Sequence, residues 1–149
     1  MAHEIIEKLP YSHPFLFVDD LQDINQNGVI GSFTFKNELD FFRGHFKEAP
    51  VTPGVILTEC CAQIGLVCLG IYLLDAQVKD FEKPQLALSS SEMEFYLPVF
   101  PDETVRVESE KIYFRFNKLK CKVKLFNQSG KLACKGILAG MLTGVESGK

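Results

Sequence analysis

Residues 44–75 read GHFKEAPVTPGVILTECCAQIGLVCLGIYLLD and contain a long, nearly continuous apolar run. Thr52 is a good helix N-cap and Pro53 suits the first helical position, so we expect a helix that continues to about Leu74. Apolar side chains occupy every face of such a helix, and a helix of this kind is normally buried by other elements. The rest of the chain is therefore expected to enclose it.

A transmembrane segment is the main alternative for this run. Residues 55–74 approach the ~20 residues that a membrane span needs. The run carries Glu59 and Gln63, however, and no Lys or Arg lies close to either end. A charge at mid-membrane costs about 2.5–3.5 kcal/mol, and basic flanking residues that would orient a span are missing. We therefore predict a core helix and no membrane span.

The remainder of the chain has the alternating pattern of an antiparallel sheet. The expected strands cover residues 17–24, 29–35, 84–96, 103–116, 118–126 and 130–142, and a short amphipathic helix covers residues 3–9. Within 118–125, lysines alternate strictly with apolar residues, which predicts one solvated and one buried face. The expected fold is α+β, with an antiparallel sheet curled around one long central helix in a single domain spanning residues 1–149.

The composition of the chain limits the partners it can bind and indicates the cell compartment in which it works. The net charge is −3 and the pI is near 5.6, which argues against nucleic acid as a partner. The N-terminus has no secretory signal pattern. Five cysteines without a C-x-x-C pair indicate free thiols packed in a core, as in cytoplasmic proteins. The histidines and cysteines show no zinc-ligand spacing, so we expect no metal.

One short segment could supply acid–base chemistry. Glu59 and Gln63 are four residues apart and thus share a helix face, where the amide can bond the carboxylate. His45 lies on the loop that leads to the helix. Gly54 stands at the helix N-terminus, where free N–H groups and the positive end of the helix dipole suit a developing oxyanion. A base, an acid and an oxyanion donor match chemistry next to a carbonyl group.

The motifs LPYSHPFLFVDD (9–20), GHF (44–46), PVTPGV (50–55) and ECCAQ (59–63) resemble the 3-hydroxyacyl-[acyl-carrier-protein] dehydratases of the hotdog fold. The resemblance implies that His45 is the base, that Glu59 is the second catalytic group and that the Gly54 N–H polarises the thioester carbonyl. It also implies a (3R)-hydroxyacyl substrate on the phosphopantetheine of an acyl carrier protein, with no other cofactor. Members of the family form homodimers with active sites shared between subunits, and these dimers often group into hexamers.

Several residues are expected to contact the acyl thioester. The substrate-binding candidates are Phe46, Pro53, Val55, Gln63 and Phe95, and the aromatic residues expected to wall an acyl tunnel are Phe41, Phe42, Phe46, Phe95 and Phe100. The lysines of 118–124 are interpreted mainly as a solvated face, with docking of an acidic carrier protein as the lesser alternative.

The chain departs from the family pattern at Lys47-Glu48, at Asp102 and at Asp20, none of which is a catalytic position. Two alternative functions stay open at this point. One is a hotdog thioesterase in which Glu59 activates water. The other is a non-catalytic acyl-binding or assembly subunit.

Overall fold

One antiparallel sheet of six strands, in the order β1-β2-β4-β5-β6-β3, forms the framework of the protein. The computed structural model describes residues 2–75 and 85–143. The strands are β1 (Asp20–Asn25), β2 (Gly28–Thr34), β3 (Gln85–Phe95), β4 (Thr104–Arg115), β5 (Lys118–Phe126) and β6 (Leu132–Thr143). All six lie within about three residues of the expected ranges; Pro84, where one expected strand starts, falls outside the described residues.

The expected alternation is clearest in β5. Leu119, Cys121, Val123 and Leu125 are all 0% exposed, while Lys122 and Lys124 between them are exposed. The buried side chains face the helix and the lysines face outward, as expected from a sheet with one dry and one wet face.

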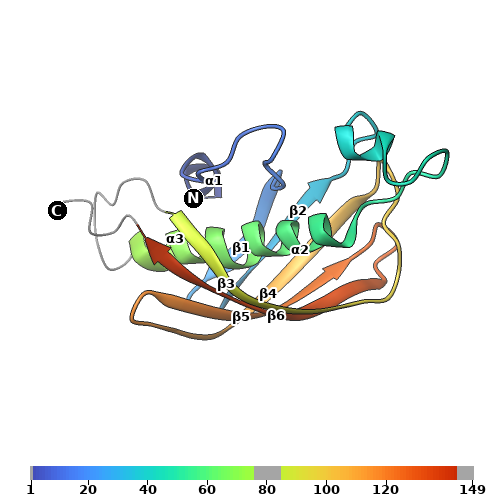
Figure 1. Cartoon of the computed structure of the whole chain (residues 1–149). Coiled ribbons are helices and arrows are strands. Elements are labelled where there is room, and N and C mark those ends of the chain that lie inside the picture. Colours follow the sequence, from blue (N-terminus) through green and yellow to red (C-terminus); the bar gives the residue numbers. More distant parts are fainter. Residues whose placement is uncertain (1, 76–84, 144–149) are drawn as a thin grey trace.

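The apolar segment forms a continuous helix across the concave face of the sheet (Figure 1). It consists of α2 (Gly54–Ala62), a π-helical segment η2 (Gln63–Cys68) and α3 (Leu69–Asp75). The helix is long and apolar enough to span a membrane, but 72% of its most apolar window is buried inside the protein. The sheet therefore covers it as the core helix that its composition predicts.

The middle of the helix lies very close to the sheet at Gly65. A Cβ atom at this position would be 2.9 Å from Val123 and 3.1 Å from the Ser109 side chain, so no larger residue fits without displacement. The Ser109 hydroxyl donates a hydrogen bond to the Gly65 carbonyl, at 3.0 Å. This contact satisfies a polar group at the π-helical segment, where the regular α-helical hydrogen-bond pattern is altered.

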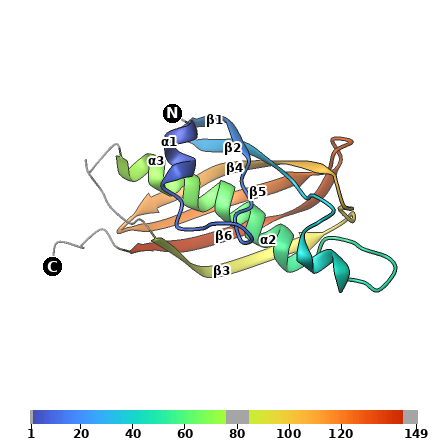
Figure 2. The ribbon, with the colours of Figure 1, turned by 90° about the horizontal axis from the view of Figure 1, so that it is seen from above.

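The N-terminal segment lies over the helix on the side away from the sheet. The short helix α1 (Ala2–Glu7) packs there through Ile5 (Figures 1 and 2). The strand expected at residue 17 begins instead at Asp20, because Phe17 and Val18 leave the sheet and enter the core. The reason is a hydrogen bond from the Phe17 N–H to the Gln63 side chain, at 2.8 Å.

All five cysteines are buried free thiols. Burial raises the pKa of the Cys60 and Cys68 thiols, and a hydrogen bond with Cys134 together with burial raises that of Cys61; both effects oppose thiolate formation. The prediction that these residues pack the core is confirmed.

The two edges of the sheet are β1 and β3. β3 is a long outer strand of 11 residues, and most of its side chains are exposed. Figure 2 shows it as the outermost strand beside the start of α2. A long, uncovered edge strand is a surface to which another strand can pair.

Candidate active site

The helix that carries the candidate residues begins one residue later than expected. Pro53 is the N-cap, with extended backbone angles (φ −60°, ψ 141°), and Gly54 is the first helical residue. The Thr52 side chain does not cap the helix; its hydroxyl is buried without a hydrogen-bond partner in the described part of the chain. The Thr52 backbone N–H instead donates to the Val99 carbonyl, at 2.9 Å. This contact anchors the segment to the loop after β3.

Gly54 opens into a surface pocket of about 260 Å³. The pocket is lined by Thr52, Gly54, Leu57, Phe95, Tyr96, Leu97 and Pro98. A Cβ atom on Gly54 would be 3.3 Å from the Phe95 ring. The first N–H groups of a helix have no intrahelical acceptor, so the backbone at Gly54 can present a donor where a carbonyl oxygen could enter.

His45 lies on the loop that follows the 3-10 helix η1 (Asp40–Arg43). Its Nδ1 is 2.9 Å from the Val51 carbonyl oxygen, and the Val51 N–H donates to the His45 carbonyl at 2.8 Å. The imidazole stacks on the Phe46 ring, with centroids 4.2 Å apart. Since a carbonyl can only accept, Nδ1 carries a hydrogen here, and in the corresponding neutral tautomer the lone pair lies on Nε2.

Glu59 is half-buried on α2 and is supported by Gln63. The Gln63 Nε2 donates to Glu59 Oε2 at 3.0 Å and to the Phe15 carbonyl at 3.0 Å, while Gln63 Oε1 accepts the Phe17 N–H at 2.8 Å. Burial raises the pKa of Glu59, and the hydrogen bond from Gln63 partly opposes that rise. In the described part of the chain no Lys, Arg or His forms an ion pair with Glu59.

Gln63 was predicted to contact the substrate, but the structure places its side chain in the protein interior. Its side chain is 0% exposed and its polar atoms bond to the protein, so it lies beneath Glu59 and has no surface for substrate. Its effect is to orient the carboxyl group and to hold the segment around Phe15 and Phe17 against the helix.

Tyr11 is a neighbour of this site that the sequence analysis missed. Burial and the nearby Glu59 carboxylate raise the pKa of Tyr11 to about 12, and its ring centroid lies 6.2 Å from that of Phe15. No periodicity marks Tyr11, because it belongs to an irregular segment that the Gln63 hydrogen bonds help to hold against the helix.

The aromatic candidates separate into two groups. Phe41 and Phe42 lie 4.7 Å apart, and Phe41 contacts Phe35 of the core at 6.4 Å between centroids, so these two rings are part of the packing. Phe46, Phe95 and Phe100 are 58%, 49% and 51% exposed. The other two substrate-binding candidates lie at the same end of the helix: Val55 is 76% exposed and Pro53 is half-buried.

Within the described chain, His45 and Glu59 do not contact each other. The side-chain contacts of His45 are with Val51 and Phe46, and those of Glu59 are with Gln63. The residues predicted to act as base and acid thus lie on one polypeptide without contacting each other within it.

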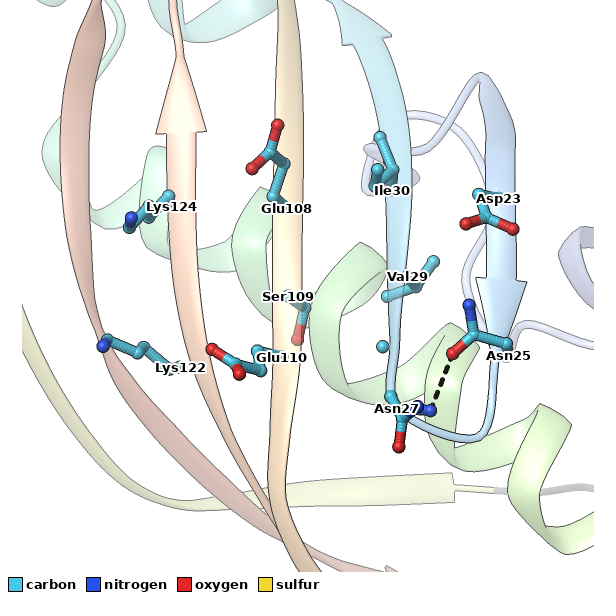
Figure 3. Close-up of a pocket in the computed structure, with 11 residues that line it drawn as sticks. Asp23, Asn25, Asn27, Val29, Ile30, Glu108, Ser109, Glu110, Lys122 and Lys124 are labelled. Carbon is cyan, nitrogen blue, oxygen red and sulfur yellow. Dashed lines mark hydrogen bonds between the residues drawn. The ribbon is translucent and has the colours of Figure 1, made fainter.

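A larger pocket, of about 300 Å³, lies on the opposite face of the sheet between β1, β2, β4 and β5 (Figure 3). Charged side chains of the solvated face line it, and the helix lies behind the strands. No group of three or more His, Cys, Asp or Glu side chains in the described residues is placed to hold a metal ion.

Comparison with known proteins identifies relatives over most of the chain. A family model described as "FabA-like domain" matches residues 9–137. The chain is 34% identical over 138 residues to the 3-hydroxyacyl-[acyl-carrier-protein] dehydratase FabZ of Clostridium perfringens, covering 90% of this chain and 92% of that protein. It is 32% identical over 146 residues to FabZ of Caulobacter vibrioides, covering 97% of this chain and 88% of that protein.

Solved structures with the same fold have far more distant sequences. The dehydratase heterocomplex ApeI:P of Xenorhabdus doucetiae aligns with a TM-score of 0.74 at 13% identity, covering 91% of this chain and 89% of that chain. A hypothetical thioesterase of Streptococcus pneumoniae in complex with coenzyme A aligns with a TM-score of 0.60 at 14% identity, covering 84% and 85%. These likenesses confirm the predicted hotdog fold.

Proposed function

This chain belongs to the family of FabA-like domains, and from that premise we propose that it removes water from a 3-hydroxyacyl thioester on an acyl carrier protein. The product is the 2-enoyl thioester of fatty-acid or related acyl-chain synthesis. The observation that carries the proposal is the Glu59–Gln63 pair: a half-buried carboxyl group with a raised pKa, supported by an amide and free of cations in the described chain. A raised pKa favours the protonated carboxyl group, which is the form that can donate a proton to a leaving hydroxyl.

His45 is proposed to start the reaction as the base. The Val51 carbonyl holds Nδ1–H, so the Nε2 lone pair is free to take the proton alpha to the thioester. The electron pair of that C–H bond moves towards the carbonyl oxygen, and the Gly54 N–H stabilises the negative charge that forms there.

Glu59 is proposed to complete the elimination as the acid. Because Oε2 accepts the Gln63 hydrogen bond, the carboxyl proton belongs on Oε1. As the enolate electrons form the carbon–carbon double bond, the C–O bond to the 3-hydroxyl breaks and Oε1 supplies the proton that releases water. Proton return from His45 to Glu59, directly or through solvent, regenerates the starting state.

The active site is proposed to assemble from two copies of this chain in the cytoplasm. His45 and Glu59 do not meet within one described chain, and the β3 edge is uncovered beside Val55 and Phe95, which are 76% and 49% exposed. Antiparallel pairing of two β3 edges would join the sheets and cover these side chains. It would also let His45 of one subunit act with Glu59 of the other. The neighbour from Xenorhabdus is a heterocomplex, so pairing with a different dehydratase-like chain is the competing arrangement.

Assay of the purified protein with 3-hydroxyacyl and saturated acyl thioesters tests the function. We expect loss of one water from the hydroxyacyl thioester, detected by mass spectrometry and by absorbance of the conjugated product, and no release of free thiol. Thiol release from both substrates would instead establish a thioesterase. Binding without turnover of either substrate would indicate the non-catalytic alternative.

A further inference from the structure

The Thr52 hydroxyl is a buried polar group without a hydrogen bond. Thr52 is 4% exposed, and its Oγ1 is enclosed by protein and has no partner among the described residues. Most buried polar groups in proteins are hydrogen-bonded, because an unsatisfied group loses its water without compensation. A valine has nearly the same shape and would fill this position without that cost. The partner of the hydroxyl is therefore expected to come from outside the described chain.

Thr52 borders the same pocket as the first residue of the central helix. Both Thr52 and Gly54 line the surface pocket of about 260 Å³. The Pro53 carbonyl accepts the N–H groups of Ile56 and Leu57, at 2.9 and 3.1 Å. The Gly54 N–H, in contrast, has no acceptor in the part of the chain that the structure describes. The backbone of Gly54 and the side chain of Thr52 thus bring two unused donors to one pocket.

The rest of the pocket lining indicates which kind of group these donors would bind. It is apolar except for one hydroxyl and consists of Leu57, Phe95, Tyr96, Leu97 and Pro98. The Tyr96 hydroxyl already donates to Glu94 Oε1 at 2.8 Å. A buried water typically makes about three hydrogen bonds and would find few partners here. A carbonyl oxygen accepts hydrogen bonds through its two lone pairs and is attached to carbon, so it matches two donors among apolar walls.

We propose that the Thr52 hydroxyl is a second hydrogen-bond donor to the thioester oxygen, beside the Gly54 N–H. The proposal rests on the proposed function, since it adds a group that contacts the same substrate. When the base removes the proton alpha to the thioester, negative charge gathers on this oxygen, and both donors stabilise it. Thr52 keeps its own proton throughout, so the hydroxyl binds and polarises the carbonyl without taking part in proton transfer.

The proposed contact requires the hydroxyl to turn towards the pocket by rotation about the Thr52 Cα–Cβ bond. The backbone of Thr52 is fixed, because its N–H donates to the Val99 carbonyl at 2.9 Å. No hydrogen bond to a described residue holds the hydroxyl in its enclosed position, and side chains exchange between staggered rotamers. The thioester oxygen supplies the hydrogen bond that the hydroxyl lacks, so binding favours the rotamer that faces the pocket.

The carbonyl stretch of a bound thioester tests this role without turnover. The probe is hexanoyl-pantetheine with an isotope label at the thioester carbonyl; it has no 3-hydroxyl and cannot be dehydrated. Binding to the wild type should lower the infrared frequency of the labelled carbonyl relative to the free probe. Thr52→Val removes the hydroxyl and should move the band back towards the free value, while Thr52→Ser should keep the wild-type band. An identical band in the wild type and Thr52→Val would overturn the proposal.

Stability and kinetics separate this role from a structural one. Thr52→Val should melt at the wild-type temperature or higher, because the change removes a buried hydroxyl that has no partner. Its kcat for dehydration should fall by about tenfold to a hundredfold, and by more than KM changes, because the donor acts mainly on the charge of the transition state. A lower melting temperature with a normal kcat would show that the hydroxyl pairs within the protein or with a second subunit, and would refute the donor role.

Thr34→Val is the matched control, because the same change removes a hydroxyl that pairs with Thr104 at 2.7 Å on an exposed part of the sheet. Neither kcat nor the carbonyl band should change in this variant. If Thr52→Val does not fold, Thr52→Ser and Thr52→Ala supply the comparison, since they differ only by the hydroxyl. A wild type that shifts the carbonyl band but dehydrates no hydroxyacyl thioester would contradict the proposed function and leave the donor role intact. Normal dehydration with equal bands for the Ser and Ala variants would contradict the donor role alone.

Discussion

Replacement of Gln63 by Met is the sharpest test of the hydrogen-bond network beneath Glu59. Methionine keeps the straight chain and approximate volume of glutamine, so packing should change little. The amide hydrogen bonds to Glu59, to the Phe15 carbonyl and to the Phe17 N–H are lost together.

The expected cost follows from which backbone groups lose their partners. The Phe17 N–H is buried and the Phe15 carbonyl is partly buried, and an unsatisfied buried polar group costs about 1–3 kcal/mol. We therefore expect the free energy of unfolding to fall by about 2–4 kcal/mol. That is a large part of the 5–15 kcal/mol typical of a domain, although it should leave the protein folded at room temperature.

The activity of Gln63→Met should respond in a second, independent way. Gln63 lowers the pKa of Glu59 against the effect of burial, so its removal should raise that pKa further. Since the proposed mechanism uses the protonated carboxyl of Glu59, the alkaline limb of the pH–rate profile should move to higher pH. The value of kcat should also fall, because the carboxyl loses its orientation.

Urea unfolding at neutral pH and a pH series of initial rates measure the two effects. Gln22→Met is the matched control, because the Gln22 amide bonds Ser32 at an exposed site; such a change should alter stability by less than about 0.5 kcal/mol. An equally small change for Gln63→Met, or an alkaline limb that moves to lower pH, would refute the reasoning.

Three further predictions concern the catalytic residues. Glu59→Gln should abolish dehydration. Because the pKa of Glu59 is raised in the folded protein, the stability of the wild type should fall as the pH rises above 4.5, the ordinary pKa of a glutamate side chain. In thermal melts the variant should therefore be more stable than the wild type above that pH and should show no such gain below it. The variants His45→Ala and Glu59→Ala should each be inactive alone. When the two variants are mixed and exchange subunits, roughly a quarter of wild-type activity should return. If the mixture stays inactive although exchange has been demonstrated, the site is not shared between subunits. Gly54→Ala should fold but lose activity in the dehydration assay. The added Cβ would lie 3.3 Å from the Phe95 ring and would displace the thioester from the helix N–H. A normal kcat/KM would contradict the proposed role of the Gly54 N–H in binding the thioester oxygen.

Much of the fold could be predicted from local patterns. The strict alternation of 118–125 identified β5 and its buried face, because successive side chains of a strand point to opposite sides. The apolar segment from Gly54 to Asp75 identified the core helix, since a helix without a polar face is covered either by protein or by lipid, and Glu59, Gln63 and the missing basic flanks argued against a membrane span. The helix begins one residue later than predicted, and the expected Thr52 side-chain cap does not form; the Thr52 N–H bonds to Val99, a partner 47 residues away.

The features of the candidate site also fall into two groups, those that local sequence patterns predict and those that appear only in the folded protein. Local sequence patterns were enough to predict that Glu59 and Gln63 share a helix face and that Gly54 lies at the start of the helix. Three further features became visible only in the folded protein: the complete burial of Gln63, the position of Tyr11 near Glu59 and the hydrogen bond between the His45 ring and the Val51 carbonyl. These features depend on irregular segments whose positions are set by hydrogen bonds between residues distant in sequence. No periodicity encodes such contacts, because they form only after the sheet and helix have packed together.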